Sequence, residues 1–581
     1  MKYLLSVLFL LSASSAFSVD NVTVPNKFQA GDIVSASKMN QNFQQLADEI
    51  TKLRAALASP SRPNTSSVTP ANGATNVSLS SNITINFSEA MDVSTIATAN
   101  TLNGSNITLQ DSSGKSIQGA ITYSNQVATF NPANDLKYSE TYTVTISTSV
   151  ANSAGILLGI PYSWSFQTVL NTPASISAGQ SHTCATYFDD TVKCSGANNQ
   201  GSLGNGTGLI SLSPVNVTGI TNATAVSTSN YYSCALLDDN TIRCWGQGWS
   251  GVMGDGSSTN WYVPANRVSG ITTATKVSTA GSHACALLSD GAVQCWGYNY
   301  LGSLGGGQDN STMQQLTPIT VSGISNATSI TTGGGDMPGS GRGYSCALLS
   351  AGTVKCWGRD EYGQLGSGSR NTTTFTWPGS TSQQTEYFSR VPVQVAGISN
   401  ATAISASRTS WMGHTCAIVD GGSVKCWGSD DSGQLGSGSR NTQNIKMCES
   451  CSTGTYYFSP TPVAVTGIST ATAISAGGQH TCALLADKTI KCWGADWQGQ
   501  LGSGSKNTET VTNGSNTYTQ EMSFTPVVVS GINTAIAVSA GESHTCALLE
   551  DKTVKCWGNN SQGQYGDGLG ASSSAPVLSL F

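Results

Sequence analysis

A single pattern returns seven times between about residue 174 and residue 581, and this repetition limits the possible folds more than any other feature of the chain. Each copy carries two cysteines ten positions apart, while the first cysteines of successive copies lie 50, 51, 61, 70, 66 and 64 residues apart. The segment around the cysteines is therefore constant, and the segment after it varies in length as loops do. Such a period predicts one supersecondary unit that buries its faces against copies of itself.

Each copy contains the signature of a β-hairpin. Runs such as Cys-Ala-Leu-Leu and Thr-Val-Lys-Cys-Trp flank a short turn, and a later Pro-Val-x-Val run predicts a further strand. Four short strands in roughly 50 residues are typical of a propeller blade. The predicted fold class is therefore all-β, with a seven-bladed β-propeller over residues 172–581.

The paired cysteines are predicted to form disulfides. An even spacing across a tight turn can place two residues opposite each other, and cross-strand Cβ atoms about 4.5–5.5 Å apart are near enough to be bridged. The predicted pairs are Cys184 with Cys194, Cys234 with Cys244, Cys285 with Cys295, Cys346 with Cys356, Cys416 with Cys426, Cys482 with Cys492 and Cys546 with Cys556. Cys448 and Cys451 lie in a loop, and we expect a local disulfide there rather than a redox site, because no strand–helix context surrounds them.

The first residues predict export. Lys2 precedes an apolar run over residues 3–11 and small residues up to Ser18, which is typical of a secretory signal peptide over residues 1–18. An oxidising compartment favours disulfides over metal ligands for the cysteines. No segment reaches the ~20 apolar residues of a membrane span. The expected location is secreted, extracellular or at the cell surface.

Charge and histidine placement argue against several functions. The net charge is −6 and no run of Lys or Arg occurs, so nucleic-acid binding is not expected. All five histidines occupy one slot, two residues before the first cysteine, which tyrosine fills in copies two and four. A slot shared by His and Tyr predicts packing and hydrogen bonding rather than metal binding. We therefore predict no catalytic residue, no metal and no cofactor.

The repeat itself resembles a known family. The Gly-x-x-His-Thr-Cys-Ala-Leu and Gly-Gln-Leu-Gly segments, with the Trp-Gly of six copies, are similar to the regulator of chromosome condensation repeat, a resemblance that covers about residues 174–581 and implies a seven-bladed propeller. The six tryptophans are expected in the core between blades. Ser195 replaces tryptophan in copy one, which predicts that this blade is the least well packed. The family's nuclear role is not implied for an exported, acidic chain.

Copies four, five and six carry long insertions, at about residues 369–390, 439–459 and 505–523. Insertions at equivalent points of consecutive blades lie side by side on one face, and aromatic residues among Ser, Asn and Gly make an adaptable contact surface. The alternative is that these loops cover one another and the blade edges. The predicted binding residues are Trp377, Tyr387, Phe388, Tyr456, Tyr457, Phe458, Tyr518 and Phe524.

Two further segments precede the propeller. Met39, Phe43, Leu46, Ile50, Leu53 and Leu57 form a short heptad seam, which predicts a coiled-coil helix within residues 19–58. Residues 24–43 resemble the start of trimeric bacterial surface-fibre proteins, which implies a homotrimer through residues 39–57; the alternative is a helix packed on the next domain. A linker over 59–64 leads to an all-β module over 65–169, which resembles bacterial Ig-like domains.

The leading hypothesis is a non-catalytic secreted or cell-surface protein for binding or adhesion, whose loops contact an extracellular protein or glycan. One alternative is a secreted inhibitor or regulator that acts through the propeller face, since the same repeat class includes a secreted β-lactamase-inhibiting propeller. The other alternative is an extracellular enzyme, which needs convergent carboxylates or a nucleophile with its base. Asp360, Glu361, Asp430 and Asp431 lie near blade turns, where we expect solvated acids.

Overall fold

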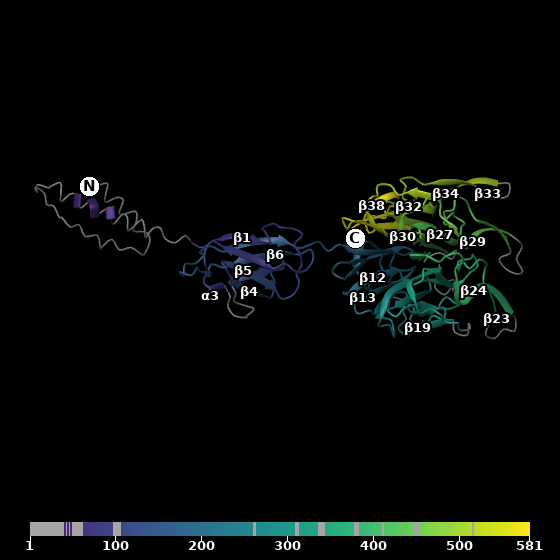
Figure 1. Ribbon diagram of the computed structural model, residues 1–581, viewed down its shortest axis with the longest axis horizontal. Coiled ribbons are helices and arrows are strands. Elements are labelled where there is room, and N and C mark those ends of the chain that lie inside the picture. Colours follow the sequence, from purple (N-terminus) through teal and green to yellow (C-terminus); the bar gives the residue numbers. More distant parts are fainter. Residues whose placement is uncertain are drawn as a thin grey trace, which may run out of the picture. The chain divides into compact units, whose positions relative to one another are not determined.

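The computed structural model describes residues 40–41, 43–45, 47–48, 62–96, 106–258, 263–307, 313–334, 343–376, 383–408, 412–445, 454–513 and 516–581. The chain forms two compact units, Met1–Leu170 and Asn171–Phe581 (Figure 1). The described residues from 40 to 48 are helical, and Phe43 is the one member of the predicted heptad seam among them. The predicted signal peptide lies outside the described residues. No described helix is long and apolar enough to cross a membrane.

The first unit contains two antiparallel sheets that share one core. One sheet has the order β1 (Thr65–Thr69), β2 (Ile83–Phe87), β5 (Val127–Pro132), β4 (Gly119–Ser124), and the other has the order β3 (Ile107–Gln110), β6 (Thr141–Ile146), β7 (Tyr162–Gln167). A single helical turn, α3, spans Val93–Ile96. Alternate residues of β2 are buried and pack against apolar residues of β6 and β7. This arrangement is a β-sandwich, as the Ig-like sequence predicts.

The second unit consists of seven antiparallel sheets, and every sheet takes its strands from one continuous stretch of chain. The blades are β8 (Pro173–Ala178), β9 (His182–Tyr187), β10 (Val192–Gly196), β11 (Ser211–Asn216); β12 (Ala223–Thr228), β13 (Tyr232–Leu237), β14 (Ile242–Gly246), β15 (Val263–Arg267); β16 (Ala274–Thr279), β17 (His283–Leu288), β18 (Val293–Tyr298), β19 (Gln314–Thr320); β20 (Ala327–Gly334), β21 (Gly343–Leu349), β22 (Val354–Arg359), β24 (Gln383–Gln394); β25 (Ala403–Ala406), β26 (His414–Val419), β27 (Ser423–Ser429), β29 (Gly454–Ala464); β30 (Ala471–Ala476), β31 (His480–Leu485), β32 (Ile490–Ala495), β34 (Asn516–Val528); and β35 (Ala535–Ala540), β36 (His544–Leu549), β37 (Val554–Gly558), β38 (Ser573–Leu578).

The seven sheets close into a ring. The first strand of each blade contacts the first strand of the next, and β35 of blade seven contacts β8 of blade one. No strand is shared between the two ends of the ring, so contacts between complete blades close it. These features confirm the predicted all-β, seven-bladed propeller preceded by an Ig-like sandwich.

The cysteines of each hairpin lie directly opposite each other. The Cα atoms of the seven pairs are 4.0–4.1 Å apart, the close spacing of a non-hydrogen-bonded pair, and their sulfur atoms are bonded at 2.07–2.14 Å. The structure thus contains every disulfide predicted for the repeat: Cys184 with Cys194, Cys234 with Cys244, Cys285 with Cys295, Cys346 with Cys356, Cys416 with Cys426, Cys482 with Cys492 and Cys546 with Cys556. Cys448 and Cys451 lie outside the described residues, so the local disulfide expected there stays a prediction.

The six repeated tryptophans fill the junctions between blades, as predicted. Each is fully buried, at 0% exposure. The Trp427 ring lies against Gly366 of the preceding blade, where an added Cβ would come within 2.7 Å of the ring, and Nε1 of Trp427 donates to the carbonyl of Gln364 at 2.9 Å. Gly366 has a φ of +67°, which also favours glycine. The Trp and the Gly of the Gly-Gln-Leu-Gly segment are thus two halves of one contact.

Blade one lacks this tryptophan, and two other aromatic residues occupy the junction with blade seven. Tyr565 stands where the other copies have Leu or Met, and it is fully buried. Phe581 packs against the same cluster, and a Cβ on Gly566 would lie 3.1 Å from its ring and 2.8 Å from Oγ of Ser195. Tyr565 and Phe581 therefore occupy part of the space left by the missing indole, while the expectation that blade one is the least well packed stays a prediction.

Candidate functional site

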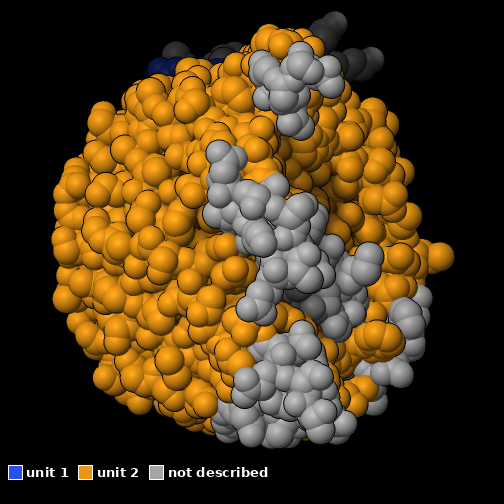
Figure 2. Space-filling model, turned by 90° about the vertical axis from the view of Figure 1, so that its right-hand side faces the viewer, with its two compact units in different colours: residues 1–170 blue, residues 171–581 orange. Residues whose placement is uncertain are grey.

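The insertions of blades four, five and six form β-hairpins. β23 (Thr372–Thr376), β28 (Thr442–Ile445) and β33 (Thr508–Asn513) each pair with an extended outermost strand of their own blade, β24, β29 and β34. In Figure 1 these hairpins lie along one side of the propeller, at the right of the picture. Figure 2 looks onto that side of the second unit, where the described residues form a broad surface. The irregular parts of three consecutive blades are thus gathered on one side.

A buried aspartate anchors each hairpin. In blade five, Oδ2 of Asp430 accepts hydrogen bonds from the backbone N–H and the Nδ2 of Asn441 at 2.7 and 2.8 Å, and Oδ1 accepts from the N–H of Leu435 at 3.1 Å. Asp360 and Asp496 make the same contacts in blades four and six. Blades one, three and seven carry asparagine at this position, which bonds the turn, and the described residues of these blades contain no inserted hairpin.

These anchors correct the expectation that Asp360 and Asp430 are solvated turn acids, because both are fully buried. Burial raises the pKa of Asp360 to about 7 and that of Asp430 to about 6, while the hydrogen bonds from asparagine and backbone oppose the rise. Their donors all come from the same blade. Asp360 and Asp430 therefore hold their hairpins in place, and they do not point towards a shared catalytic site.

A cation lies between aromatic rings at the base of two hairpins. The guanidinium of Arg370 is 3.7 Å from the centre of the Tyr387 ring in its own blade and 5.9 Å from that of Phe458 in the next blade.

Arg440 repeats this arrangement one blade further. Its guanidinium is 4.7 Å from the centre of the Tyr457 ring in blade five and 5.9 Å from that of the Phe524 ring in blade six. Such contacts are worth about 0.5–2 kcal/mol, and they join neighbouring hairpins.

Blade six replaces the cation–aromatic contact with an ion pair. Lys506 stands where blades four and five have arginine, Glu521 stands where they have tyrosine, and Nζ of Lys506 lies 2.9 Å from Oε2 of Glu521. The side chains change together while their contact is kept. The hairpin bases are therefore held in place by whichever pair of residues the copy contains.

The aromatic residues predicted to bind a partner differ in their exposure. Phe388 and Phe458 are 0% and 2% exposed, which corrects the expectation that these two are available on the surface. Both belong to outer strands that pair with the third strand of the blade, opposite Arg359 and Ser429, and this pairing directs the rings into the junction with the neighbouring blade. The Phe458 ring lies 6.2 Å from the ring of Tyr362, edge to face.

The remaining predicted aromatics are more accessible. Tyr387, Tyr456, Tyr457 and Phe524 are half-buried, and Tyr518 is 40% exposed. Trp377 lies outside the described residues. Tyr518 and the outer faces of the half-buried rings therefore stay candidates for contact with a partner.

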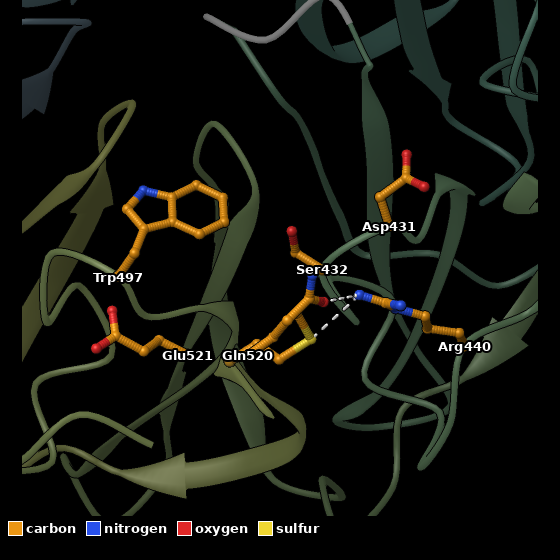
Figure 3. Close-up of a pocket in the computed structure, with 7 residues that line it drawn as sticks. Asp431, Ser432, Arg440, Trp497, Gln520 and Glu521 are labelled. Atoms are coloured by element: carbon orange, nitrogen blue, oxygen red, sulfur yellow. Dashed lines mark hydrogen bonds between the residues drawn. The ribbon is translucent and has the colours of Figure 1, made fainter. Parts of the chain in front are cut away.

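A pocket of about 280 Å³ lies between blades five and six (Figure 3). It is lined by Asp431, Ser432, Arg440, Trp497, Gln520, Glu521 and Met522. Arg440 donates to Oε1 of Gln520 and to the sulfur of Met522, so the hairpin of blade six closes one side of the pocket against blade five. Burial raises the pKa of Asp431, and the nearby Arg440 lowers it.

Trp497 was not identified from the sequence. It lies two residues before the first glycine of Gly-Gln-Leu-Gly, where the other copies have Asn199, Trp249, Tyr300, Glu361, Asp431 and Ser561. The variability of this position could have indicated it, because a residue that differs between near-identical copies is not needed for the fold of the blade. Trp497 is 37% exposed, in contrast to the six fully buried tryptophans of the repeat.

The histidines are buried and hydrogen-bonded, and their partners are hydroxyl groups of neighbouring blades, which the sequence did not specify. Nε2 of His480 lies 2.8 Å from the Thr545 hydroxyl of the next blade, and Nε2 of His544 lies 2.9 Å from the hydroxyl of Thr183, which joins blade seven to blade one. Burial lowers the pKa of all five, to about 4 for His182 and His283 and to about 3 for the others. Within the described ranges, no three His, Cys, Asp or Glu residues are placed to hold a metal ion.

Comparisons with known families agree with this architecture. Residues 60–168 match the bacterial Ig-like domain. Regulator of chromosome condensation (RCC1) repeats match at residues 274–303, 339–364, 471–500 and 535–564, and a second description of the same repeat matches at 421–484 and 492–548. The chain therefore contains RCC1 repeats and a bacterial Ig-like domain.

Similar proteins include two with recorded functions. The E3 ubiquitin-protein ligase HERC2 of Homo sapiens is 27% identical over 307 residues, which cover 51% of this chain and only 5% of that protein. The ultraviolet-B receptor UVR8 of Arabidopsis thaliana is 26% identical over 408 residues, which cover 69% of this chain and 80% of the receptor.

Two solved structures support the fold. Yeast RCC1 (Prp20), seen bound to Kap60, has a TM-score of 0.52 at 17% identity and covers 70% of this chain and 84% of its own. Human WBSCR16 also has a TM-score of 0.52 at 17% identity and covers 67% of this chain and 94% of its own. Likeness at this level of identity concerns the fold alone.

Proposed function

We propose that this chain, built from RCC1 repeats that follow a bacterial Ig-like domain, is an exported, non-catalytic binding protein. The hairpins of blades four to six, with the pocket between blades five and six, contact an extracellular protein or glycan. The observation that carries the proposal is the clustering of irregularity: seven blades repeat one structure, and three adjacent blades add anchored hairpins on one side. Repeat proteins commonly place their binding sites on such insertions.

The cysteines support an extracellular location. Seven hairpins of the described propeller each contain a disulfide, and such bonds persist in oxidising compartments. The binding role of RCC1-type propellers also fits, since the yeast RCC1 of the solved complex is bound to Kap60. A rigid ring that presents variable loops is suited to recognition without chemistry.

The N-terminal segment adds a proposed multimeric stem. The heptad seam at residues 39–57 would join three chains, so that several propellers act on one surface and their binding is strengthened through effective concentration. Sedimentation equilibrium of the full exported chain tests this idea, with a trimer expected. A monomer at all concentrations up to about 100 μM, well above the nM–μM affinities of stable association, would exclude it.

The main proposal is tested by exchanging the hairpins. In the full chain, the insertions at about residues 369–390, 439–459 and 505–523 are replaced by the short connection of copy two. Retention of both proteins is measured on surfaces coated with mucin, fibronectin, laminin or collagen and on an array of glycans. We expect the natural chain to be retained by at least one surface and the exchanged chain to lose this retention while it keeps its seven disulfides and its unfolding midpoint.

Two results would count against the proposal. One is equal retention of both chains, which would move the contact away from the hairpins. The other is retention of neither chain by any surface. Circular dichroism and thiol titration of the exchanged chain serve as the control that the propeller itself is intact.

A further inference from the structure

We propose that the pocket between blades five and six binds one ring of a neutral hexopyranose, with Trp497 as the stacking platform. The inference rests on the proposed binding function and specifies the ligand class of that site. It is carried by the composition of the pocket, by the balance of its charges and by the placement of Trp497.

The walls of the pocket combine one aromatic surface with several polar groups. Figure 3 shows the Trp497 indole on the blade-six side, across from Asp431 and Ser432 on the blade-five side, with Gln520 below Ser432 and beside Arg440. A hexopyranose exposes a patch of C–H bonds on at least one face of its ring, which packs on the electron-rich face of an indole. Its hydroxyl groups lie around the rim, where they need hydrogen-bond partners.

The pocket offers such partners. Gln520 uses its Oε1 to accept from Arg440, and no described group accepts a hydrogen bond from its Nε2. The Ser432 hydroxyl donates to Oε1 of Gln479 at 2.8 Å, which leaves its oxygen able to accept. Asp431 accepts one contact, from the Ser429 hydroxyl at 3.4 Å. A few directed polar groups beside an apolar surface are the usual composition of a small-ligand site.

The charges of the pocket argue for a neutral ligand. Asp431 is compensated by the nearby Arg440, and Glu521 is paired with Lys506 at 2.9 Å. With Lys506 counted, which pairs with Glu521 but does not line the pocket, two carboxylates are balanced by two cations, so no excess charge attracts a basic peptide or an anion. An indole with acidic neighbours could also hold a cationic side chain, but such a ligand would have to compete with cations that are already in place.

The size of the pocket agrees with one sugar ring. Its volume of about 280 Å³ lies just below the range for drug-sized ligands, which is roughly 300–1,000 Å³. The pocket is also formed in part by the insertion hairpin of blade six, through Gln520 to Met522. A site built from an insertion is not a by-product of the repeat.

The experiment measures sugar binding to the full exported chain. Methyl β-D-glucoside, cellobiose, methyl β-D-galactoside and lactose are titrated by calorimetry and observed by saturation-transfer NMR up to about 10 mM, which detects Kd values near 1 mM. We expect at least one of them to bind. The variant Trp497→Ser, which copies the serine found in blade seven, should bind about tenfold more weakly.

The matched control is Trp249→Ser. Trp249 occupies the equivalent position in blade two, is 39% exposed and does not line the pocket, so its loss should leave the affinity unchanged. Both variants should keep the unfolding midpoint, because the other copies tolerate serine or acidic residues at this position. A second pocket variant, Gln520→Ala, should weaken binding several-fold without removing the stacking surface.

Three outcomes would overturn the inference: no sugar of the panel binds, binding is equal in Trp497→Ser and the natural chain, or a trilysine peptide binds at the pocket instead. These outcomes are separable from a failure of the proposed function. If the hairpin exchange abolishes retention on coated surfaces while no sugar binds, the binding function stands and the sugar site is refuted. If the exchange leaves retention unchanged, the proposed function is refuted whatever the sugars do.

Discussion

The junction of blades seven and one offers the sharpest test of how the ring closes. Phe581 and Tyr565 fill the space that a tryptophan fills at the other six junctions. Replacing a fully buried phenylalanine with alanine costs about 3–5 kcal/mol. Because Phe581 is half-buried, it loses roughly half as much apolar contact, and we expect Phe581→Ala to lower the free energy of unfolding by about 2 kcal/mol.

Restoring the tryptophan should reverse the effect. Ser195→Trp alone introduces an indole while Phe581 is present, and overpacking of this kind costs about 1–3 kcal/mol. In the double variant the indole can occupy the vacated space. Its Nε1 can also donate to the carbonyl of Gln564, which now has only a 3.5 Å contact with the Ser195 hydroxyl. We expect the double variant to lie within about 1 kcal/mol of the natural chain, which corresponds to a coupling energy of about 3 kcal/mol.

Urea unfolding, followed by circular dichroism, measures the four proteins of this cycle. The slope m should be the same for all, so that midpoints report stability. Leu580→Ala is the control, because Leu580 is 60% exposed and its loss should change stability by less than about 0.5 kcal/mol. Additive effects of the two substitutions, within about 0.5 kcal/mol, would refute the compensation argument.

Three further predictions concern the blades. Cys482→Ala with Cys492→Ala opens an eleven-residue loop and should lower the free energy of unfolding by about 3 kcal/mol, measured against the natural chain without reductant; a loss below about 1 kcal/mol would contradict the entropic account. Because the pKa of His480 is lowered to about 3, its contribution to stability is present above pH 6.5 and is lost as pH falls from there towards 3. Urea midpoints at pH 7 and 5 should therefore show that the free energy of unfolding of His480→Gln depends less on pH than that of the natural chain, by up to about 1.4 kcal/mol per pH unit. The same pH dependence in both proteins would exclude this role of His480. Arg440→Leu should weaken the attachment of the blade-five hairpin by about 1 kcal/mol and so make it more sensitive to proteolysis. Arg440→Lys with Tyr457→Glu, which copies the ion pair of blade six, should protect the hairpin, and equal cleavage of both variants would show that the contact does not hold it.

The candidate site shows the limits of reading single residues from a chain. The insertions and their position on consecutive blades were predictable, because they interrupt a regular period. The burial of Phe388 and Phe458 was not, since it depends on how far each outer strand continues its pairing with the blade. Trp497 was also missed, because its importance comes from Gln520 and Met522, residues more than twenty positions away that fold back beside it.

The blade, the number of blades and the disulfides within them were all readable from the amino-acid order, because they depend on interactions inside one hairpin and on their sevenfold recurrence. A cysteine ten residues from its partner across a tight turn has little choice of geometry. The sequence also predicted tryptophans between the blades, but three features of the junctions emerged only in the folded ring: the contact of His544 with Thr183, the closure by Phe581, and the pocket beside Trp497. These contacts join segments up to several hundred residues apart, and no local pattern specifies which of them meet.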